Sequence, residues 1–253
     1  MLVMISIIFG ALIGSFLNVC ISRLPNEESI VSPGSHCPQC QAPIRFYDNI
    51  PLLSYLLLGG KCRNCRNPIS LQYPLVEGIT AGMSLLLFLR FGPTLSYLVY
   101  FCFVAGLIVI TVIDLYHQII PDVISLPGII AGLLGALVIP QMTFLNSIAG
   151  ALLGGGSLFA VATLYQWVFK REGMGGGDVK LLAMIGAFLG WKAVILTILL
   201  SSLIGSVIGI AIMVVKGKDF KYAIPFGPFL SLGAVIALFY GEALIQWYLG
   251  LNR

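Results

Sequence analysis

A glycine-rich stretch with a single carboxylate separates two long apolar segments of the chain: Gly173-Met174-Gly175-Gly176-Gly177-Asp178-Val179-Lys180. Four glycines in five positions let the backbone turn freely and allow another chain to approach closely. The stretch places Asp178 at the edge of a hydrophobic helix predicted to begin near Val179. Moving an ionised carboxylate toward lipid costs several kcal/mol, roughly 2.5 to 3.5 on insertion scales. Two interpretations follow: Asp178 is a functional carboxylate, or it is an ordinary helix N-cap, a position that favours aspartate.

The composition is that of an integral membrane protein. Of the 253 residues, 58% are hydrophobic and 9% are charged, and the mean hydropathy is +1.00. The net charge of +4 includes no block of like charge and no basic stripe, so we expect no nucleic-acid partner. The apolar run from Met1 to Ile21 lacks a basic region before it, and Arg23 follows it. It is therefore predicted to be an uncleaved first span.

Apolar runs long enough, or nearly long enough, to cross a bilayer predict an all-α protein with about eight transmembrane helices. The runs begin near residues 1, 74, 95, 123, 144, 179, 193 and 224. The sixth, from Val179 to Trp191, is short for a hydrocarbon core of ~30 Å. We expect a tilted or partly re-entrant helix there, joined closely to the next one.

Basic residues are distributed unevenly among the connections between these runs. With eight spans, eleven of the 14 lysines and arginines fall on one side of the membrane: Arg23, Arg45, Lys61, Arg63, Arg66, Lys170, Arg171, Lys180, Lys216, Lys218 and Lys221. The other side holds Arg90, Lys192 and Arg253. The positive-inside rule therefore predicts that the long loop after the first span is cytoplasmic and that both termini are outside.

The largest water-exposed segment, residues 23–73, carries two CxxC pairs. These are Cys37 with Cys40 and, after 21 intervening residues, Cys62 with Cys65. Two such pairs supply the four ligands of a tetrahedral zinc site. Because no ligand position is then open to water, we predict that the metal is structural. Two disulfides or a redox pair are the alternative, which a reducing cytoplasm disfavours. About fifty residues with so little apolar mass need such a metal to fold.

A second carboxylate, Asp114, ends the apolar run from Tyr100 to Ile113. Asp122 follows Pro121 and precedes a new apolar run, so its position is explained by the start of a helix. No such local feature explains an aspartate at position 114, where an apolar span ends. Glu77 lies one turn into the second span and is expected to reach water at the membrane interface.

With alternating spans, Asp114 and Asp178 lie at the same, cytoplasmic, face of the membrane. Two neighbouring carboxylates cannot both ionise cheaply, so one of them keeps a proton. Aspartic proteolysis uses such a pair, in which the ionised partner draws a proton from water and the protonated partner polarises the scissile carbonyl. We therefore predict that Asp114 and Asp178 are catalytic. The predicted active-site loop holds Gly175, Gly176, Gly177 and Lys180, where the glycines let a substrate backbone approach.

Together these residues resemble the bacterial prepilin peptidases (type IV leader peptidases/N-methyltransferases), which are GxGD intramembrane aspartic proteases. The shared motifs follow the family's order along nearly the whole chain. They are Gly14-Ser15-Phe16-Leu17-Asn18-Val19-Cys20 with Arg23-Leu24-Pro25, the CxxC pairs flanking Asp48-Asn49-Ile50-Pro51, Tyr73-Pro74 with Glu77, Asp114 with Ile120-Pro121-Asp122, Gly175-Gly176-Gly177-Asp178-Val179-Lys180-Leu181, and Pro225-Phe226-Gly227-Pro228.

The resemblance implies an enzyme of the bacterial inner membrane that removes the basic leader of type IV prepilins and type II secretion pseudopilins on the cytoplasmic side. It also implies N-methylation of the new terminus by S-adenosylmethionine. Asp114 and Asp178 would be the catalytic pair, and Cys37, Cys40, Cys62 and Cys65 would bind zinc. The implied domains are a first span (1–22), a methyltransferase-associated zinc domain (23–73) and a transmembrane peptidase domain (74–253). The chain has no glycine-rich dinucleotide fingerprint, so the cofactor-binding residues stay unidentified.

Three other functions fit part of the pattern. A transporter or channel would use both aspartates for protons or cations, but would not need the paired cysteines. A non-enzymatic assembly protein of a secretion or pilus machine would use the zinc domain for docking. A zinc-dependent protease is disfavoured because the chain has no HExxH motif and four thiolates fill the metal.

Overall fold

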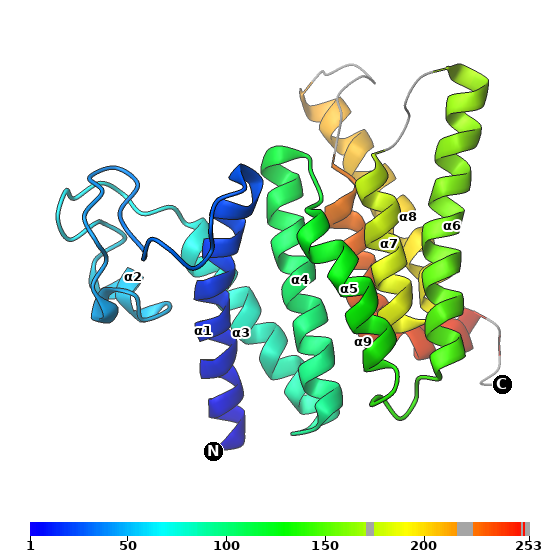
Figure 1. Ribbon diagram of the computed structural model, residues 1–253, viewed down its shortest axis with the longest axis horizontal. Helices are drawn as coiled ribbons and strands as arrows, with labels where there is room; N and C mark the ends of the chain where they lie inside the picture. Colours follow the sequence, from blue (N-terminus) through cyan, green and yellow to red (C-terminus); the bar gives the residue numbers. More distant parts are fainter. Residues whose placement is uncertain (171–174, 217–224, 249, 251–253) are drawn as a thin grey trace. The chain divides into compact units, whose positions relative to one another are not determined.

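The computed structural model describes residues 1–170, 175–216, 225–248 and 250, with the side chain of Lys216 left out (Figure 1). Gly173 and Met174 of the glycine-rich stretch lie outside the described residues. So do four of the basic residues used to predict the orientation: Arg171, Lys218, Lys221 and Arg253.

Throughout the described part of the chain, the regular structure is helical and no strand is formed. The helices are α1 (Leu2–Arg23), η1 (Leu24–Asn26), η2 (Phe46–Asp48), α2 (Leu53–Leu57), α3 (Gln72–Phe91), α4 (Leu95–His117), α5 (Asp122–Gly135), α6 (Phe144–Phe169), α7 (Gly176–Leu189), α8 (Trp191–Lys216) and α9 (Gly227–Tyr248).

Each of the eight predicted apolar segments coincides with one of these helices. Six helices among the described residues are long and apolar enough to cross a membrane: α1, α3, α4, α6, α8 and α9. The other two, α5 and α7, have 14 residues each. The all-α membrane fold is therefore confirmed with six candidate spans, whereas the crossing of all eight stays a prediction.

The chain forms two compact units, Met1–Val109 and Ile110–Arg253, so α4 contributes to both. In the first unit α1 packs closely on α3 through small residues. A Cβ added to Gly10 would lie 2.6 Å from Ser84 Cβ, and one added to Gly14 would lie 2.8 Å from the Cα of Glu77. Such close approach favours van der Waals packing between helices in lipid. The predicted division at residues 22 and 73 concerns function and stays a prediction.

In the second unit α7 is the central helix. Its buried residues face all directions around the helix and include Leu181, Leu182, Ile185 and Phe188. It packs against α5, α6, α8 and α9, and Figure 1 shows it between α5 and α6. A helix that is apolar all round is stable only when other elements enclose it. Gly190 alone joins it to α8, as expected for a short helix connected closely to the next one.

The contact between α6 and α7 depends on two glycines. A Cβ added to Gly150 would lie 2.2 Å from the carbonyl oxygen of Gly186, so the two backbones leave no space for a side chain. We expect Gly150→Ala to lower the melting temperature of the detergent-solubilised protein by several degrees, because the helices must separate. Gly156→Ala on the same helix is the control, since nothing lies within 4 Å of its added Cβ. Equal melting temperatures for both variants would contradict the close contact.

Candidate active site and metal centre

Asp178 lies in the first turn of α7. The helix begins at Gly176, earlier than the predicted start near Val179, and Gly175 is its N-cap residue. Because Gly175 occupies the N-cap position and Asp178 lies two residues inside the helix start, the interpretation of Asp178 as the helix N-cap is wrong. Its half-buried carboxylate is therefore not explained by helix capping.

Asp114 lies in the last turn of α4 and is 5% exposed. The backbone N–H of Gly227 donates a hydrogen bond of 2.9 Å to its Oδ2. Gly227 is the first residue of α9, and the first N–H groups of a helix have no partner within the helix. The positive end of the helix dipole therefore faces the carboxylate. The Pro225-Phe226-Gly227-Pro228 motif at the start of α9 thus positions a donor for Asp114.

Ile120 connects the surroundings of the two aspartates. A Cβ added to Gly177 would lie 2.9 Å from Ile120 Cβ, and one added to Gly227 would lie 3.4 Å from Ile120 Cδ1. The same side chain thus contacts the start of α7 and the start of α9. Gly177 precedes Asp178 and Gly227 binds Asp114, so their shared neighbour Ile120 places the two aspartates close together. The structure brings the predicted pair to one end of the second unit.

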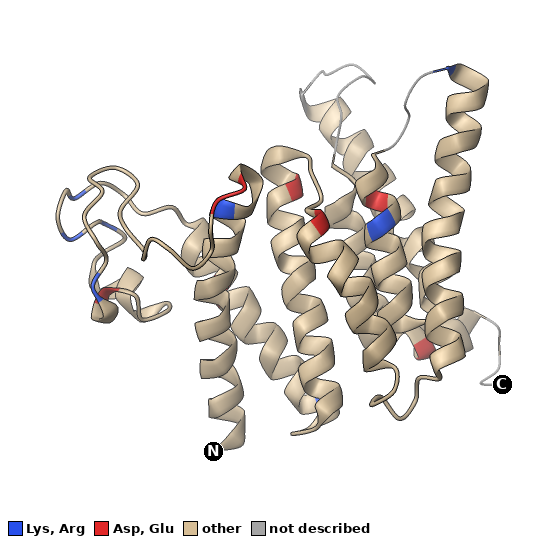
Figure 2. Ribbon diagram, viewed as in Figure 1, with Lys and Arg blue, Asp and Glu red and all other residues tan. Residues whose placement is uncertain are grey.

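Lys180 is bound to a different aspartate. Its Nζ lies 2.7 Å and 2.8 Å from the two carboxylate oxygens of Asp122, the first residue of α5. The pair is partly exposed, with 37% and 55% of the two side chains accessible. An exposed pair stabilises little, about 0 to 1 kcal/mol. Its effect is to hold the segment after α4 against α7, and Figure 2 shows the charges at this end of α5 and α7.

A hollow of about 310 Å³ lies close to Gly227 in the second unit. It is lined by small residues of α8 and by two phenylalanines at the start of α9: Ser202, Gly205, Ser206, Phe226 and Phe229. Because Phe226 precedes Gly227, the hollow adjoins the residue that holds Asp114.

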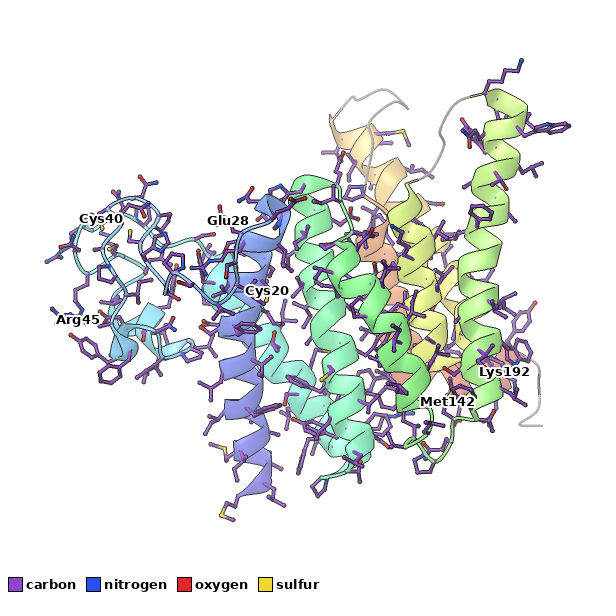
Figure 3. The ribbon with its side chains drawn as sticks, in the orientation of Figure 1. Cys20, Glu28, Cys40, Arg45, Met142 and Lys192 are labelled. Carbon is purple, nitrogen blue, oxygen red and sulfur yellow. The ribbon has the colours of Figure 1, made fainter. Side chains whose placement is uncertain are left out.

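The four cysteines of the CxxC pairs form a cluster in the first unit. Their sulfur atoms all lie within 4.8 Å of one another, and Cys37 Sγ is 3.8 Å from Cys65 Sγ. Zn–S bonds of about 2.3 Å in a tetrahedron separate the sulfurs by about 3.8 Å. Figure 3 shows Cys40 among the irregular loops of this unit. The sequence-predicted ligands thus come together in a group that can hold one metal ion.

The two CxxC segments adopt the same turn. In one, Cys37 N–H bonds to the carbonyl of Ala42, and in the other Cys62 N–H bonds to the carbonyl of Asn67. The residue after each second cysteine is left-handed, with φ of 57° at Gln41 and 61° at Arg66. Each turn thus presents two sulfurs from a rigid backbone, as zinc knuckles do.

The thiols also have the electrostatics of metal ligands. The Asn64 amide donates a hydrogen bond to Cys40 Sγ and lowers the pKa of that thiol to about 6. A backbone hydrogen bond from Asn67 lowers the pKa of Cys65, but burial and the neighbouring sulfurs outweigh it and raise the pKa to about 11. Four sulfurs this close cannot all be thiolates unless a cation balances their charge.

We expect about one zinc per chain by elemental analysis of the purified protein, and none in the Cys40→Ser variant. Removal of one of four thiolates leaves an incomplete tetrahedron, and the loops that hold no other core lose their order. Increased proteolysis of residues 30–70 would report this loss. Cys20→Ser is the control, because Cys20 lies on α1 outside the cluster. Full occupancy in the Cys40→Ser variant would contradict the assignment of these ligands.

Glu77 is the residue whose environment the sequence predicted wrongly. It is 7% exposed, and its Oε2 accepts a 2.7 Å hydrogen bond from the backbone N–H of Leu52. The hydroxyl of Ser15 on α1 also bonds to it. The expected access to water is absent because α1 and the loop before α3 cover this turn. The spacing of Gly10 and Gly14 indicates a close α1 contact and is the signal that could have revealed the burial.

The fold and the two sites show which class of protein this is. It is a multi-pass helical membrane protein with two neighbouring carboxylates in one unit and a four-cysteine cluster in the other. Residues 8–91 match the family model of the bacterial Peptidase A24 N-terminal domain, and residues 101–210 match that of the type IV leader peptidase family.

Curated relatives from several bacteria carry the name prepilin leader peptidase/N-methyltransferase. The chain is 38% identical to the one from Pseudomonas aeruginosa, with 98% of this chain and 93% of the relative covered. It is 38% identical to the one from Aeromonas hydrophila (96% and 92% covered) and 37% identical to the one from Legionella pneumophila (96% and 93%). No solved structure gives a significant match. The chain belongs to the family of prepilin leader peptidases/N-methyltransferases.

Proposed function

We propose that this protein is a membrane-embedded aspartic endopeptidase that removes the leader of type IV prepilins and pseudopilins and then methylates the new N-terminus. The observation that carries the peptidase activity is the pair of carboxylates, Asp114 and Asp178, held close together at one end of a helical membrane unit. The family membership supports both activities.

The environments of the two aspartates assign their roles. Asp114 accepts the N–H of Gly227 at the positive end of α9, and both features stabilise a carboxylate. Asp114 is therefore the ionised partner and takes a proton from the attacking water. Asp178 holds the proton and donates it to the carbonyl oxygen, which makes the carbonyl carbon electrophilic. The water oxygen bonds to that carbon, and the C–N bond breaks as the amine receives a proton.

The surroundings of the pair suit a peptide at the membrane surface. The glycines Gly175 and Gly176 present little bulk, since an added Cβ would meet no atom closer than 4.0 Å. An extended substrate backbone can therefore reach the start of α7. Lys180 is bound to Asp122 in a partly exposed ion pair and therefore takes no part in proton transfer.

The methyl transfer requires S-adenosylmethionine, which supplies a methyl group on a positively charged sulfur. When bound, this donor would supply the methyl group that the new N-terminal amine of the cleaved substrate takes up. The four-cysteine cluster binds zinc as a structural ion, because its four ligands leave no open position for a substrate.

The basic residues orient the protein in the bacterial inner membrane. The cysteine cluster and the aspartate pair lie on the cytoplasmic side, and both termini lie outside. A basic leader would stay in the cytoplasm while the apolar helix after it lies in the bilayer. The scissile bond would then reach the depth of Asp114.

The function is tested by incubating purified protein with a prepilin and S-adenosylmethionine and measuring the product masses. Loss of the leader together with the gain of one methyl group is expected. An uncut prepilin would contradict the peptidase, and leader loss without a mass gain would contradict the methyltransferase. Ion flux in proteoliposomes without peptide cleavage would instead favour a transporter.

A further inference from the structure

A cavity of about 290 Å³ lies in the first unit, along the second half of α1. One wall is a face of α1, and the opposite wall is the loop that follows it, where the chain turns back beside the helix (Figure 1). The lining residues are Leu12, Ser15, Phe16, Val19, Arg23, Ile30, Val31, Pro33, Gly34, Ser35 and Asn49. This lining contains one cation and no carboxylate.

The cation, Arg23, is almost completely buried. It is 8% exposed, and its guanidinium donates hydrogen bonds to the carbonyl oxygens of Ser29 (2.8 Å) and Pro33 (2.6 Å), with Gly34 at 3.4 Å. Within the described part of the chain it forms no ion pair, and the nearby Glu28, labelled in Figure 3, is exposed. Carbonyl oxygens accept from the N–H groups but do not balance the positive charge, so this buried guanidinium favours an anionic ligand.

An apolar stripe on α1 continues from Arg23 toward the middle of the helix. It consists of Val19, Phe16 and Leu12, which together with Arg23 follow at spacings of three and four residues and therefore lie on one face. Leu12 is 55% exposed and Phe16 is 47% exposed. Because α1 is long and apolar enough to cross a membrane, this stripe is open to the acyl chains of lipids.

The length of this face matches one leaflet of a bilayer. The helix rises about 16 Å from Leu12 to Arg23, and the hydrocarbon of one leaflet is about 15 Å thick, half of a ~30 Å core. Leu12 lies in the middle of α1, so Arg23 reaches the depth of the lipid phosphates when α1 spans the membrane. Val31 in the loop wall is apolar and 86% exposed, as expected for a loop that contacts the membrane surface.

Two polar side chains of the loop wall can assist in binding an anion. Ser35 follows Gly34, whose carbonyl accepts a hydrogen bond from Arg23, and Asn49 lines the same cavity. Among the residues that the structure describes, neither the Ser35 hydroxyl nor the Asn49 amide has a hydrogen-bond partner. Both groups are donors, which phosphate oxygens accept.

We propose that this cavity binds the headgroup of an anionic phospholipid, with its phosphate on Arg23 and its acyl chains along the apolar stripe. The cavity can hold a phosphate and the glycerol attached to it but not a whole phospholipid, so the chains lie on the exposed face of α1. Arginine binds phosphate through charge-assisted hydrogen bonds. Phosphatidylglycerol brings one negative charge, which balances the guanidinium, whereas phosphatidylcholine carries its own cation. The buried cation disfavours a basic peptide as the occupant.

The site is tested by native mass spectrometry of the full-length protein in detergent, with phosphatidylglycerol and phosphatidylcholine of identical acyl chains as probes. We expect the first phosphatidylglycerol molecule to bind with a Kd at least fivefold lower than that of phosphatidylcholine. Arg23→Gln should reduce this difference to less than twofold. Arg66→Gln, the same change of charge at an arginine outside the cavity, should preserve it. Equal Kd values for the two lipids in the wild type, or an unchanged preference in Arg23→Gln, would overturn the proposal.

A second variant keeps the test valid if Arg23→Gln does not fold, which a lowered melting temperature would show. Gly34 lines the cavity and nothing lies within 4 Å of an added Cβ, so Gly34→Leu occupies free space and keeps Arg23 in place. We expect it to raise the Kd of phosphatidylglycerol at least fivefold. Gly82→Leu on α3, where an added Cβ also meets nothing within 4 Å, should leave this Kd within twofold. Unchanged binding by Gly34→Leu would contradict the site.

Soluble phosphates distinguish a lipid site from a site for a water-soluble anion. Glycerol 3-phosphate and inorganic phosphate share the headgroup chemistry but lack acyl chains, so we expect their Kd values to be at least 100-fold higher than that of phosphatidylglycerol. Binding of glycerol 3-phosphate as tightly as the lipid, and its loss in Arg23→Gln, would overturn the lipid as the occupant. Because only binding is measured, the result is independent of the peptidase and methyltransferase activities.

Discussion

Replacement of Asp114 by asparagine is expected to reduce leader cleavage by at least about 1,000-fold, and Asp178→Asn should have the same effect. Asparagine keeps the shape of the side chain but cannot take a proton from water or donate one to a carbonyl, and general acid–base catalysis contributes about 10² to 10⁴ at each role. If the two carboxylates act as one unit, the double variant should lose no more than either single variant.

The measurement is the rate of leader removal from a purified prepilin, followed by mass spectrometry. Asp122→Asn is the matched control, because Asp122 lies at the same end of the unit but is bound to Lys180. Its cleavage rate should stay within about threefold of wild type, since an exposed ion pair contributes little. Normal processing by a folded Asp114→Asn or Asp178→Asn variant would rule out the aspartic mechanism and favour an assembly role.

Gly227→Ala is expected to lower kcat for leader removal about 100-fold. An added Cβ would lie 2.6 Å from Asp114 Oδ2 and 3.2 Å from its Cγ, so the carboxylate must move. That movement also weakens the 2.9 Å hydrogen bond from the Gly227 N–H, which stabilises the charge. A displacement of about 1 Å at a reacting group can cost about 10² in rate.

Gly241→Ala on the same helix is the control, because its added Cβ would meet its nearest atoms at 3.8 and 4.0 Å, an ordinary contact. Zinc content and the melting temperature of Gly227→Ala should stay near those of wild type. An unchanged kcat in Gly227→Ala would show that the position of Asp114 is not set by α9.

Local patterns were sufficient for most of the fold. Apolar runs predicted the starts of eight helices within a few residues, because a bilayer favours helices built from continuous runs of apolar residues. The sixth run, predicted to be short for the bilayer, is the 14-residue α7, which other helices enclose. The cysteines were predictable for the same local reason, since a CxxC turn presents both sulfurs to one metal.

The environments of the acidic residues were not predictable in this way. Glu77 was expected to reach water, yet α1 and Leu52 bury it. Lys180 was assigned to the active-site loop, and its partner proved to be Asp122. In both cases the deciding contact joins residues far apart in the chain.

The amino-acid sequence by itself determined that this is a helical membrane protein with a four-cysteine cluster and two aspartates at the ends of apolar runs. These features depend on composition and on spacings of a few residues. Only the tertiary structure decided that the N-terminus of α9 supplies an N–H to Asp114, and that Arg23 lines a cavity between α1 and the loop that follows it. The physical reason is that such contacts depend on which helix faces and loops meet, and no local pattern of residues specifies that.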